Sequence, residues 1–294
     1  MKAAILVTLL GLGGEASAEE AWWLRVRADG KTLLFRPDGT GRTEVPAAAA
    51  AQAKPSADGA SIVTVKDDAT HIADADGKNS RKVSPDGLVA GWPSLSPDGQ
   101  RIAFVGLRDK QWQLHTMDRD GGNVRQLTDG PEEAGRPRFG PDGRLLYLSL
   151  RPRIVKLRPG DLLIFDGRET KAVVKNVYIA DYAWSPDGKS VAYSKAGSLV
   201  FHDLTTGAEQ EIAFPDIDKR LQSHVALRIC WRPDSQALAC TIMFLGGRMW
   251  GGPKIFGDDE LFVIPRRGQP SWFRPGEKLD EVQIEWVIRP GSGE

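Results

Sequence analysis

Two short stretches of this sequence have acidic side chains at a spacing that could bind a cation. Residues 74–79 (DADGKN) and 118–123 (DRDGGN) each place two aspartates beside a glycine turn, and carboxylate oxygens are the hard ligands that calcium prefers. A calcium-binding EF-hand loop also needs an oxygen ligand at its fifth position, where Lys78 and Gly122 stand here, and a glutamate at its twelfth. Because tight turns also require aspartate, asparagine and glycine, the sequence favours turns at both places and predicts no metal site.

No other residues are spaced for catalysis. The four histidines, His71, His115, His202 and His224, are not combined with further ligands in a zinc motif, and we expect ordinary packing or surface positions for His115 and His202. The sequence contains no Gly-x-Ser-x-Gly nucleophile motif. It therefore predicts no catalytic residues and no cofactor, although acidic residues from distant parts of the chain could still converge in the folded protein.

A repeated phrase shows which elements the chain is built from. It reads "WSPDGKSVAYS" at Trp184, and near-copies begin at Pro55, Leu95, Phe139 and Trp231, so that the turn recurs every 40 to 47 residues. Proline presets φ at the second turn position, aspartate binds nearby backbone N–H groups, and glycine accepts a positive φ. Each copy therefore predicts a tight reversal between two antiparallel strands.

A second hairpin lies between successive copies of the phrase. Its turns are centred on Gly39, Gly77, Gly121, Gly167, Gly207 and Gly268. Two hairpins in each repeat give four strands, which is the unit of a β-propeller blade. The sequence therefore predicts an all-β fold, a six-bladed β-propeller of four-stranded antiparallel blades. Five or seven blades are the alternatives, because the N-terminal unit is degenerate.

Aromatic residues and the two ends of the chain complete this prediction. Phe139, Trp184 and Trp231 stand at one repeated position, where we expect them to pack in the core between blades. Residues 21–35 lack the usual preceding strand, and residues 282–291 form a leftover strand after the last hairpin. We expect these two segments to share a blade, because pairing of the N- and C-terminal strands would remove exposed sheet edges.

The beginning of the chain resembles a secretory signal. Lys2 precedes an apolar run over residues 3–12, and small residues follow at 16–18. This pattern predicts a cleaved signal peptide over residues 1–18 and a single propeller domain over residues 19–294, in the periplasm or outside the cell. The apolar run is shorter than the ~20 residues that span a bilayer, so no transmembrane segment is expected. The 39 basic and 39 acidic residues balance, which argues against a nucleic-acid partner, and we expect a monomer.

The two cysteines flank the turn of one repeated phrase. Cys230 and Cys240 stand almost symmetrically about this turn, as two residues facing each other across a hairpin would. Export would place them in an oxidising compartment, so one interpretation is a disulfide. The other is a pair of small buried side chains on one blade, because the strand register cannot be read from the sequence.

The repeats resemble those of TolB and its relatives, a WD-repeat-like family of bacterial envelope proteins. The closest stretch is residues 93–149, which contains both hairpins in order. The resemblance implies a periplasmic propeller that binds a protein partner. It does not imply a direct equivalent of TolB, because the separate α/β domain that precedes the TolB propeller has no counterpart in this sequence. The alternative is a propeller enzyme (lyase, lactonase or glycoside hydrolase) or a carbohydrate-binding propeller that uses the central channel.

Three long connections are expected on one face of the propeller. Successive turns of an up-and-down sheet alternate between its ends, so the stretches 151–161, 214–227 and 244–260 should project together. Long loops on a rigid scaffold often carry binding residues, and aromatic residues, methionine and arginine are enriched at interface hot spots. The predicted partner-binding residues are Arg151, Arg153, Phe244, Arg248, Met249, Trp250 and Phe256, with Lys156 and Arg158 extending a basic patch.

Overall fold

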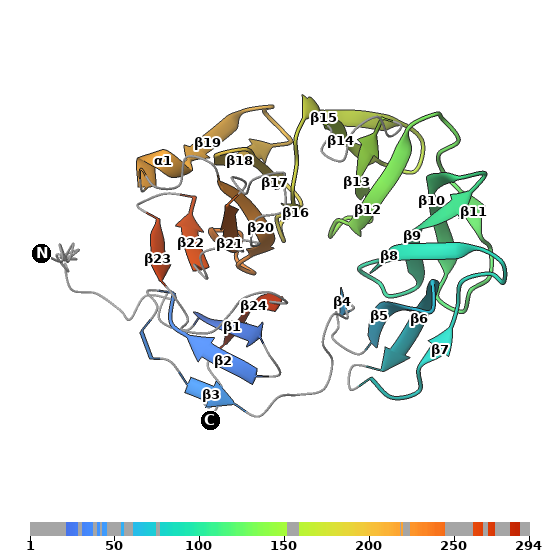
Figure 1. Ribbon diagram of the computed structural model, residues 1–294, viewed down its shortest axis with the longest axis horizontal. Coiled ribbons are helices and arrows are strands. Elements are labelled where there is room, and N and C mark those ends of the chain that lie inside the picture. Colours follow the sequence, from blue (N-terminus) through green and yellow to red (C-terminus); the bar gives the residue numbers. More distant parts are fainter. Residues whose placement is uncertain are drawn as a thin grey trace, which may run out of the picture.

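The computed structural model describes thirteen ranges of the chain, most of them strands and the turns between them. They are residues 22–28, 31–37, 40–41, 43–45, 54–55, 61–74, 77–151, 159–217, 219, 224–244, 261–266, 270–273 and 283–288. The predicted signal peptide lies outside these residues. In this part of the chain, six four-stranded antiparallel sheets are arranged in a ring (Figure 1). The protein is therefore an all-β propeller, as the repeats predicted.

We number the sheets as blades and give their strands from the innermost to the outermost. Blade 1 is β24 (Gln283–Ile288), β1 (Trp22–Ala28), β2 (Lys31–Phe35) and β3 (Thr43–Val45); blade 2 is β4 (Lys54–Pro55), β5 (Ser61–Lys66), β6 (Ala69–Asp74) and β7 (Arg81–Lys82); blade 3 is β8 (Val89–Leu95), β9 (Arg101–Arg108), β10 (Gln111–Asp118) and β11 (Arg125–Gln126). Blade 4 is β12 (Glu133–Phe139), β13 (Leu145–Leu150), β14 (Gly160–Phe165) and β15 (Thr170–Val177); blade 5 is β16 (Tyr182–Trp184), β17 (Ser190–Lys195), β18 (Ser198–Asp203) and β19 (Glu209–Ala213); blade 6 is β20 (His224–Trp231), β21 (Ala237–Phe244), β22 (Leu261–Pro265) and β23 (Ser271–Phe273). The short helix α1 (Phe214–Ile217) follows β19.

Blade 1 joins the two ends of the chain, as predicted. Strand β24 pairs with β1 in an antiparallel register that runs from Trp22 opposite Ile288 to Arg27 opposite Gln283. The C-terminal strand thus supplies the innermost position that the N-terminal unit lacks. In Figure 1, β24 lies beside β1 in the same sheet.

The repeated phrase forms the turn between the first and second strands of blades 3 to 6. In blade 3 the amide of Gly99 donates to the carbonyl of Ser96 at 2.9 Å, and Gly99 has a φ of 67°. The carboxylate of Asp98 accepts the N–H of Gln100 at 3.0 Å. The same carboxylate bond recurs in the other described copies of the phrase, where the acceptors are Asp142, Asp187 and Asp234.

Both faces of the described blades are buried against their neighbours. On β9 of blade 3, Ile102 and Phe104 pack on blade 2, whereas Ala103 and Val105 pack on blade 4. Side chains of a strand alternate between the two sides of its sheet, so one strand contributes to two cores. The large apolar residues of the phrase are therefore needed to stack the blades. Each core buries several such side chains, and burial of each one contributes about 1.5–3 kcal/mol to stability.

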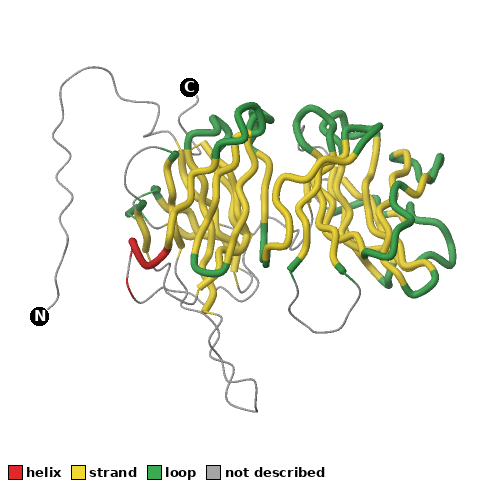
Figure 2. The backbone as a smooth tube through the Cα atoms, turned by 90° about the horizontal axis from the view of Figure 1, so that it is seen from above, coloured by secondary structure: helices red, strands yellow, loops and turns green. Residues whose placement is uncertain are grey.

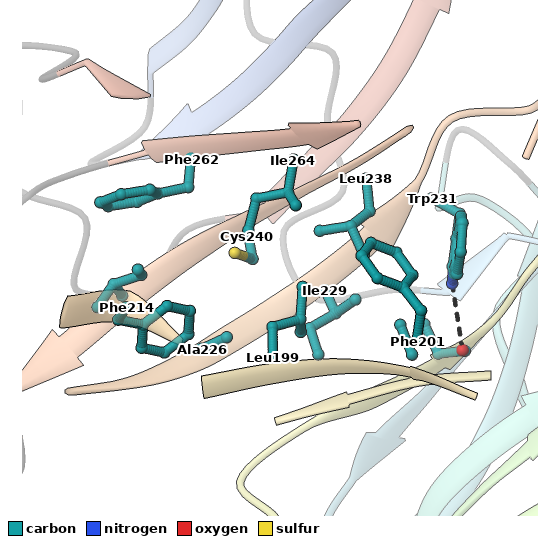
Figure 3. Close-up of a cluster of buried hydrophobic side chains, with 13 residues drawn as sticks. Leu199, Phe201, Phe214, Ala226, Ile229, Trp231, Leu238, Cys240, Phe262 and Ile264 are labelled. Carbon is teal, nitrogen blue, oxygen red and sulfur yellow. Dashed lines mark hydrogen bonds between the residues drawn. The ribbon is translucent and has the colours of Figure 1, made fainter. Parts of the chain in front are cut away.

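The aromatic residues of the phrase occupy these cores, as expected. Trp184 and Trp231 are buried, and Phe139 is half-buried against the core between blades 3 and 4. Each tryptophan also bonds to the preceding blade. The indole N–H of Trp184 donates to the carbonyl of Arg138 at 3.2 Å, and that of Trp231 donates to Ala183 at 3.2 Å (Figure 3). They stabilise contacts between blades.

The structure decides between the two interpretations of Cys230 and Cys240, and it does not support a disulfide. Cys230 lies opposite Ala239, so Cys240 is displaced by one residue and its side chain points to the other side of the sheet. Cys240 is buried in the core between blades 5 and 6 (Figure 3), and Cys230 packs toward the core between blades 6 and 1. The alternative of two small side chains on one blade is the correct one, and burial raises the pKa of the Cys240 thiol.

Candidate functional site

The strand order divides the connections between two opposite faces. We call the face with the two hairpin turns of each blade the turn face. The opposite face, which has the connections between second and third strands and between blades, is the loop face. Figure 2 shows the described loops gathered at two opposite edges of the strands. The three long stretches start from the loop face, because they follow β13, β19 and β21.

The structure places only some of the predicted partner-binding residues. Arg151 is exposed at the end of β13, and Phe244 is the last residue of β21, so both lie at the loop face. The stretch that begins at Phe214 packs inward at its start, because this side chain is buried in the core between blades 5 and 6. The other predicted positions lie outside the described residues; they are Arg153, Lys156, Arg158, Arg248, Met249, Trp250 and Phe256.

A feature that the sequence reasoning missed lies on the innermost strands near the loop face. Strands β8, β12 and β20 each contain a β-bulge at the same place in the repeat, five residues before the proline of the phrase. The bulges place Trp92, Arg136 and Arg228 in the left-handed region, with φ of 48°, 48° and 54°. Non-glycine residues occupy this region at a cost, and strained positions often mark functional sites.

The bulged side chains are exposed although they belong to innermost strands. Trp92 is 47% exposed, and Arg136 and Arg228 are also exposed. Trp92 lies edge-to-face against Trp112 of β10, with ring centroids 5.8 Å apart. A bulge redirects a side chain away from the regular alternation of its strand. Here it presents one indole and two guanidinium groups near the inner mouth of the loop face.

Blade 5 uses the equivalent position differently. Asp181 is buried, and its carboxylate accepts a guanidinium N–H of Arg138 from blade 4 at 2.6 Å and the backbone N–H of Ile229 from blade 6 at 2.9 Å. The next residue, Tyr182, donates its hydroxyl to the carbonyl of Arg136. Burial raises the pKa of Tyr182, so the phenol remains a donor. These two residues therefore fix the bulges of β12 and β20 on either side of blade 5.

A signal for two of these bulges was present in the sequence. Pro93 and Pro137 stand inside innermost strands, each two residues after a glycine, Gly91 and Gly135. A proline within a strand marks an edge or a bulge. The bulge of β20 has no such marker, because Ile229 occupies the corresponding position.

The residues considered for chemistry have structural roles. In the two aspartate-rich turns, the amides of Asn79 and Asn123 donate to Asp74 and Asp118 at 2.6 and 2.5 Å, which confirms the interpretation as turns. His115 is buried and stacked on Phe104, and its burial lowers the pKa of the imidazole. Across the described ranges, no three His, Cys, Asp or Glu side chains come together as metal ligands.

A polar hollow on the turn face offers less for recognition. It is lined by Arg81, Asp98, Gln100, Arg101, Asp118, Arg119 and Asp120. Two of its arginines are engaged with backbone: Arg81 donates to the carbonyls of Arg119 and Asp120, and Arg119 donates to the carbonyl of Gly99 at 3.3 Å. Arg101 lies over the ring of Phe139. These groups connect blades 2 and 3. No helix among the residues placed by the structure is long and apolar enough to cross a membrane.

Solved structures share this fold over most of the chain. TolB from Acinetobacter baumannii matches with a TM-score of 0.54 at 17% identity, over 92% of this chain and 67% of that one. A putative TolB from Agrobacterium tumefaciens matches with a TM-score of 0.59 at 12% identity, over 92% and 99%. An oligogalacturonate lyase in complex with manganese matches with a TM-score of 0.55 at 14% identity, over 85% and 71%. No protein-family model and no curated protein matches the sequence. At these identities the likeness is one of fold, and the chain has the fold of a TolB-like β-propeller.

Proposed function

We propose that this protein is an exported protein-binding scaffold of the bacterial cell envelope, and that its partner docks on the loop face. The observation that carries the proposal is the exposed indole of Trp92, held beside Trp112 and followed around the inner strands by the exposed side chains of Arg136 and Arg228. Tryptophan and arginine dominate binding at protein interfaces because each combines a large contact area with directional donors.

Two further points support this proposal. The fold is shared with TolB structures, and the first eighteen residues have the composition of a secretory signal. The loop-face positions Arg151 and Phe244 lie at the base of two long connections. Residues of these connections, Arg248 and Trp250 above all, would enlarge the same binding surface.

The alternative is a propeller enzyme or a carbohydrate-binding propeller that acts at the central channel. It is favoured by the fold shared with oligogalacturonate lyase and by the exposed tryptophan, because an indole face can also pack on a sugar ring. The two functions differ in what Trp92 contacts: a protein side chain in one, a glycan in the other.

The test is affinity capture by the mature chain, beginning at Glu19, from bacterial envelope extract. We expect Trp92→Ala to remove the captured partner, and Arg248→Ala with Trp250→Ala to weaken its capture. The matched control is Val124→Ala, which truncates an exposed apolar side chain on the turn face and should leave capture unchanged. Capture that survives Trp92→Ala, or turnover of an oligosaccharide by the wild type, would contradict the proposal.

A further inference from the structure

Arg136 and Arg228 flank the innermost strand of blade 5 at the same level. The guanidinium of Arg136 donates to the carbonyl of Ala180 at 2.6 Å, immediately before β16. On the other side, the residue after Arg228 donates its backbone N–H to Asp181. The two exposed arginines therefore lie on either side of one inner strand, each at the bulge in the middle of its own strand.

The surrounding contacts fix the backbone from which both arginines project before any ligand arrives. The bulge that bears Arg136 is fixed by the hydroxyl of Tyr182, and the bulge that bears Arg228 is fixed by the carboxylate of Asp181. Both of these residues are buried. Binding sites gain affinity when their groups are ordered in advance, since less conformational entropy is then lost on binding.

The charges at this place do not cancel. Arg136, Arg138 and Arg228 belong to the two bulged strands on either side of Asp181, whose carboxylate is already paired with Arg138. Arg136 has donors beyond the one used by Ala180. Arg228 is exposed and makes no hydrogen bond or ion pair with any residue that the structure describes. An anion can therefore be bound without breaking an existing ion pair.

We propose that Arg136 and Arg228 form a binding site for carboxylates, and that its ligand is an acidic peptide segment of the protein partner. This inference rests on the proposed function, which it deepens by naming the chemistry of the partner. Guanidinium groups bind carboxylates through charge-assisted, often bidentate, hydrogen bonds. Two cations on either side of one strand suit two acidic side chains of one extended segment. Trp92, on the next inner strand beyond Arg136, adds an apolar contact for the same segment.

The probe is a rhodamine-labelled hexaglutamate peptide, titrated with the mature protein and followed by fluorescence anisotropy at low salt. We expect saturable binding that weakens about tenfold in Arg228→Gln and in Arg136→Gln, because each variant loses one charge-assisted contact. Hexaglutamine should not bind. The matched control is Arg125→Gln, an exposed arginine on the outer strand β11, for which the affinity should change less than about twofold.

Several results would overturn this site. They are absence of hexaglutamate binding, equal binding of hexaglutamine, and an equal loss of affinity in Arg125→Gln, which would indicate unspecific attraction. Stronger competition by trigalacturonate than by unlabelled hexaglutamate would make the ligand an acidic sugar. Arg228→Gln is the decisive variant, because its side chain has no described partner and its replacement breaks no described contact.

The outcome can be separated from that of the proposed function. If the envelope partner is captured through Trp92 but hexaglutamate does not bind, the scaffold proposal stands and the carboxylate site is rejected. If hexaglutamate binds through Arg136 and Arg228 but no protein is captured, the site stands and its assignment to a protein partner is rejected.

Discussion

The turn-face end of the innermost strands and the bulge at their middle differ in how uniform they are. At the turn face, the described copies of the phrase keep the same carboxylate bond, made by Asp98, Asp142, Asp187 and Asp234. At the bulge position, the same place in the repeat is a half-exposed tryptophan in blade 3, an exposed arginine in blades 4 and 6, and a buried aspartate in blade 5.

The difference follows from the contacts that constrain each of the two places. A tight turn imposes its requirements through its own backbone, so every blade needs nearly the same four residues. The bulge position of an inner strand is constrained by the neighbouring blades instead, and those contacts can be made in several ways. The repeat is therefore uniform where local geometry decides and variable where recognition is possible.

Replacing Asp181 should have the largest effect on stability. It tests how much the variable bulge position depends on one buried group. We expect Asp181→Ala to lower the free energy of unfolding by about 3–5 kcal/mol, since it leaves the guanidinium of Arg138 and the N–H of Ile229 without their acceptor. Urea unfolding measures this. Glu169→Ala, which removes the exposed ion pair with Lys171, is the control and should change stability by less than about 0.5 kcal/mol.

Ser235 tests whether the uniform end tolerates a departure from its consensus. It occupies the glycine position of the phrase with a φ of 61°, and its hydroxyl accepts the N–H of Asp187 from blade 5 at 3.1 Å. Ser235→Ala should cost about 1–2 kcal/mol, because the bond between blades is lost and the backbone strain remains. Ser235→Gly loses the same bond but relieves the strain, so it should be more stable than the alanine variant by about 1 kcal/mol. Equal stability of the two variants in urea would show that the strain is negligible.

Acid should affect the turn face slightly, through its carboxylates. The hydroxyl of Ser96 and the N–H of Gln100 lower the pKa of Asp98 below its usual value of 3.8. The bonds therefore contribute stability above that value, and the contribution is lost as the pH falls through the lower pKa of the folded state. Between about pH 6 and about pH 2, the difference in Tm between wild type and Asp98→Asn should shrink. The control is Asp129→Asn, on the connection between β11 and β12 at the loop face. Its difference in Tm from wild type should change less over the same pH range.

The sequence allowed the blades and their closure to be predicted, but not the site. Turn residues such as Asp98 and Gly99 act on the backbone of their own turn, so their pattern can be recognised in the sequence alone. The bulges at Arg136 and Arg228 depend on distant contacts. The hydroxyl of Tyr182 donates to Arg136, 46 residues earlier, and Asp181 accepts from Ile229, 48 residues later. The disulfide was left open for a related reason: the hairpin turn sets a register in which Cys230 lies opposite Ala239, one residue short of Cys240, and this register could not be read from the sequence.

The pairing of β24 with β1 also determines when blade 1 can form relative to the other blades. Blades 2 to 6 are each encoded by one continuous segment, whereas blade 1 is assembled from residues at both extremes of the described chain. During synthesis β1 emerges long before β24, so the inner edge of β1 has no strand to pair with until almost the whole chain has been made. The ring can close only when the segment ending at Ile288 has been made. A truncated chain would therefore keep β1 as an unpaired edge strand, which can pair with other chains and aggregate.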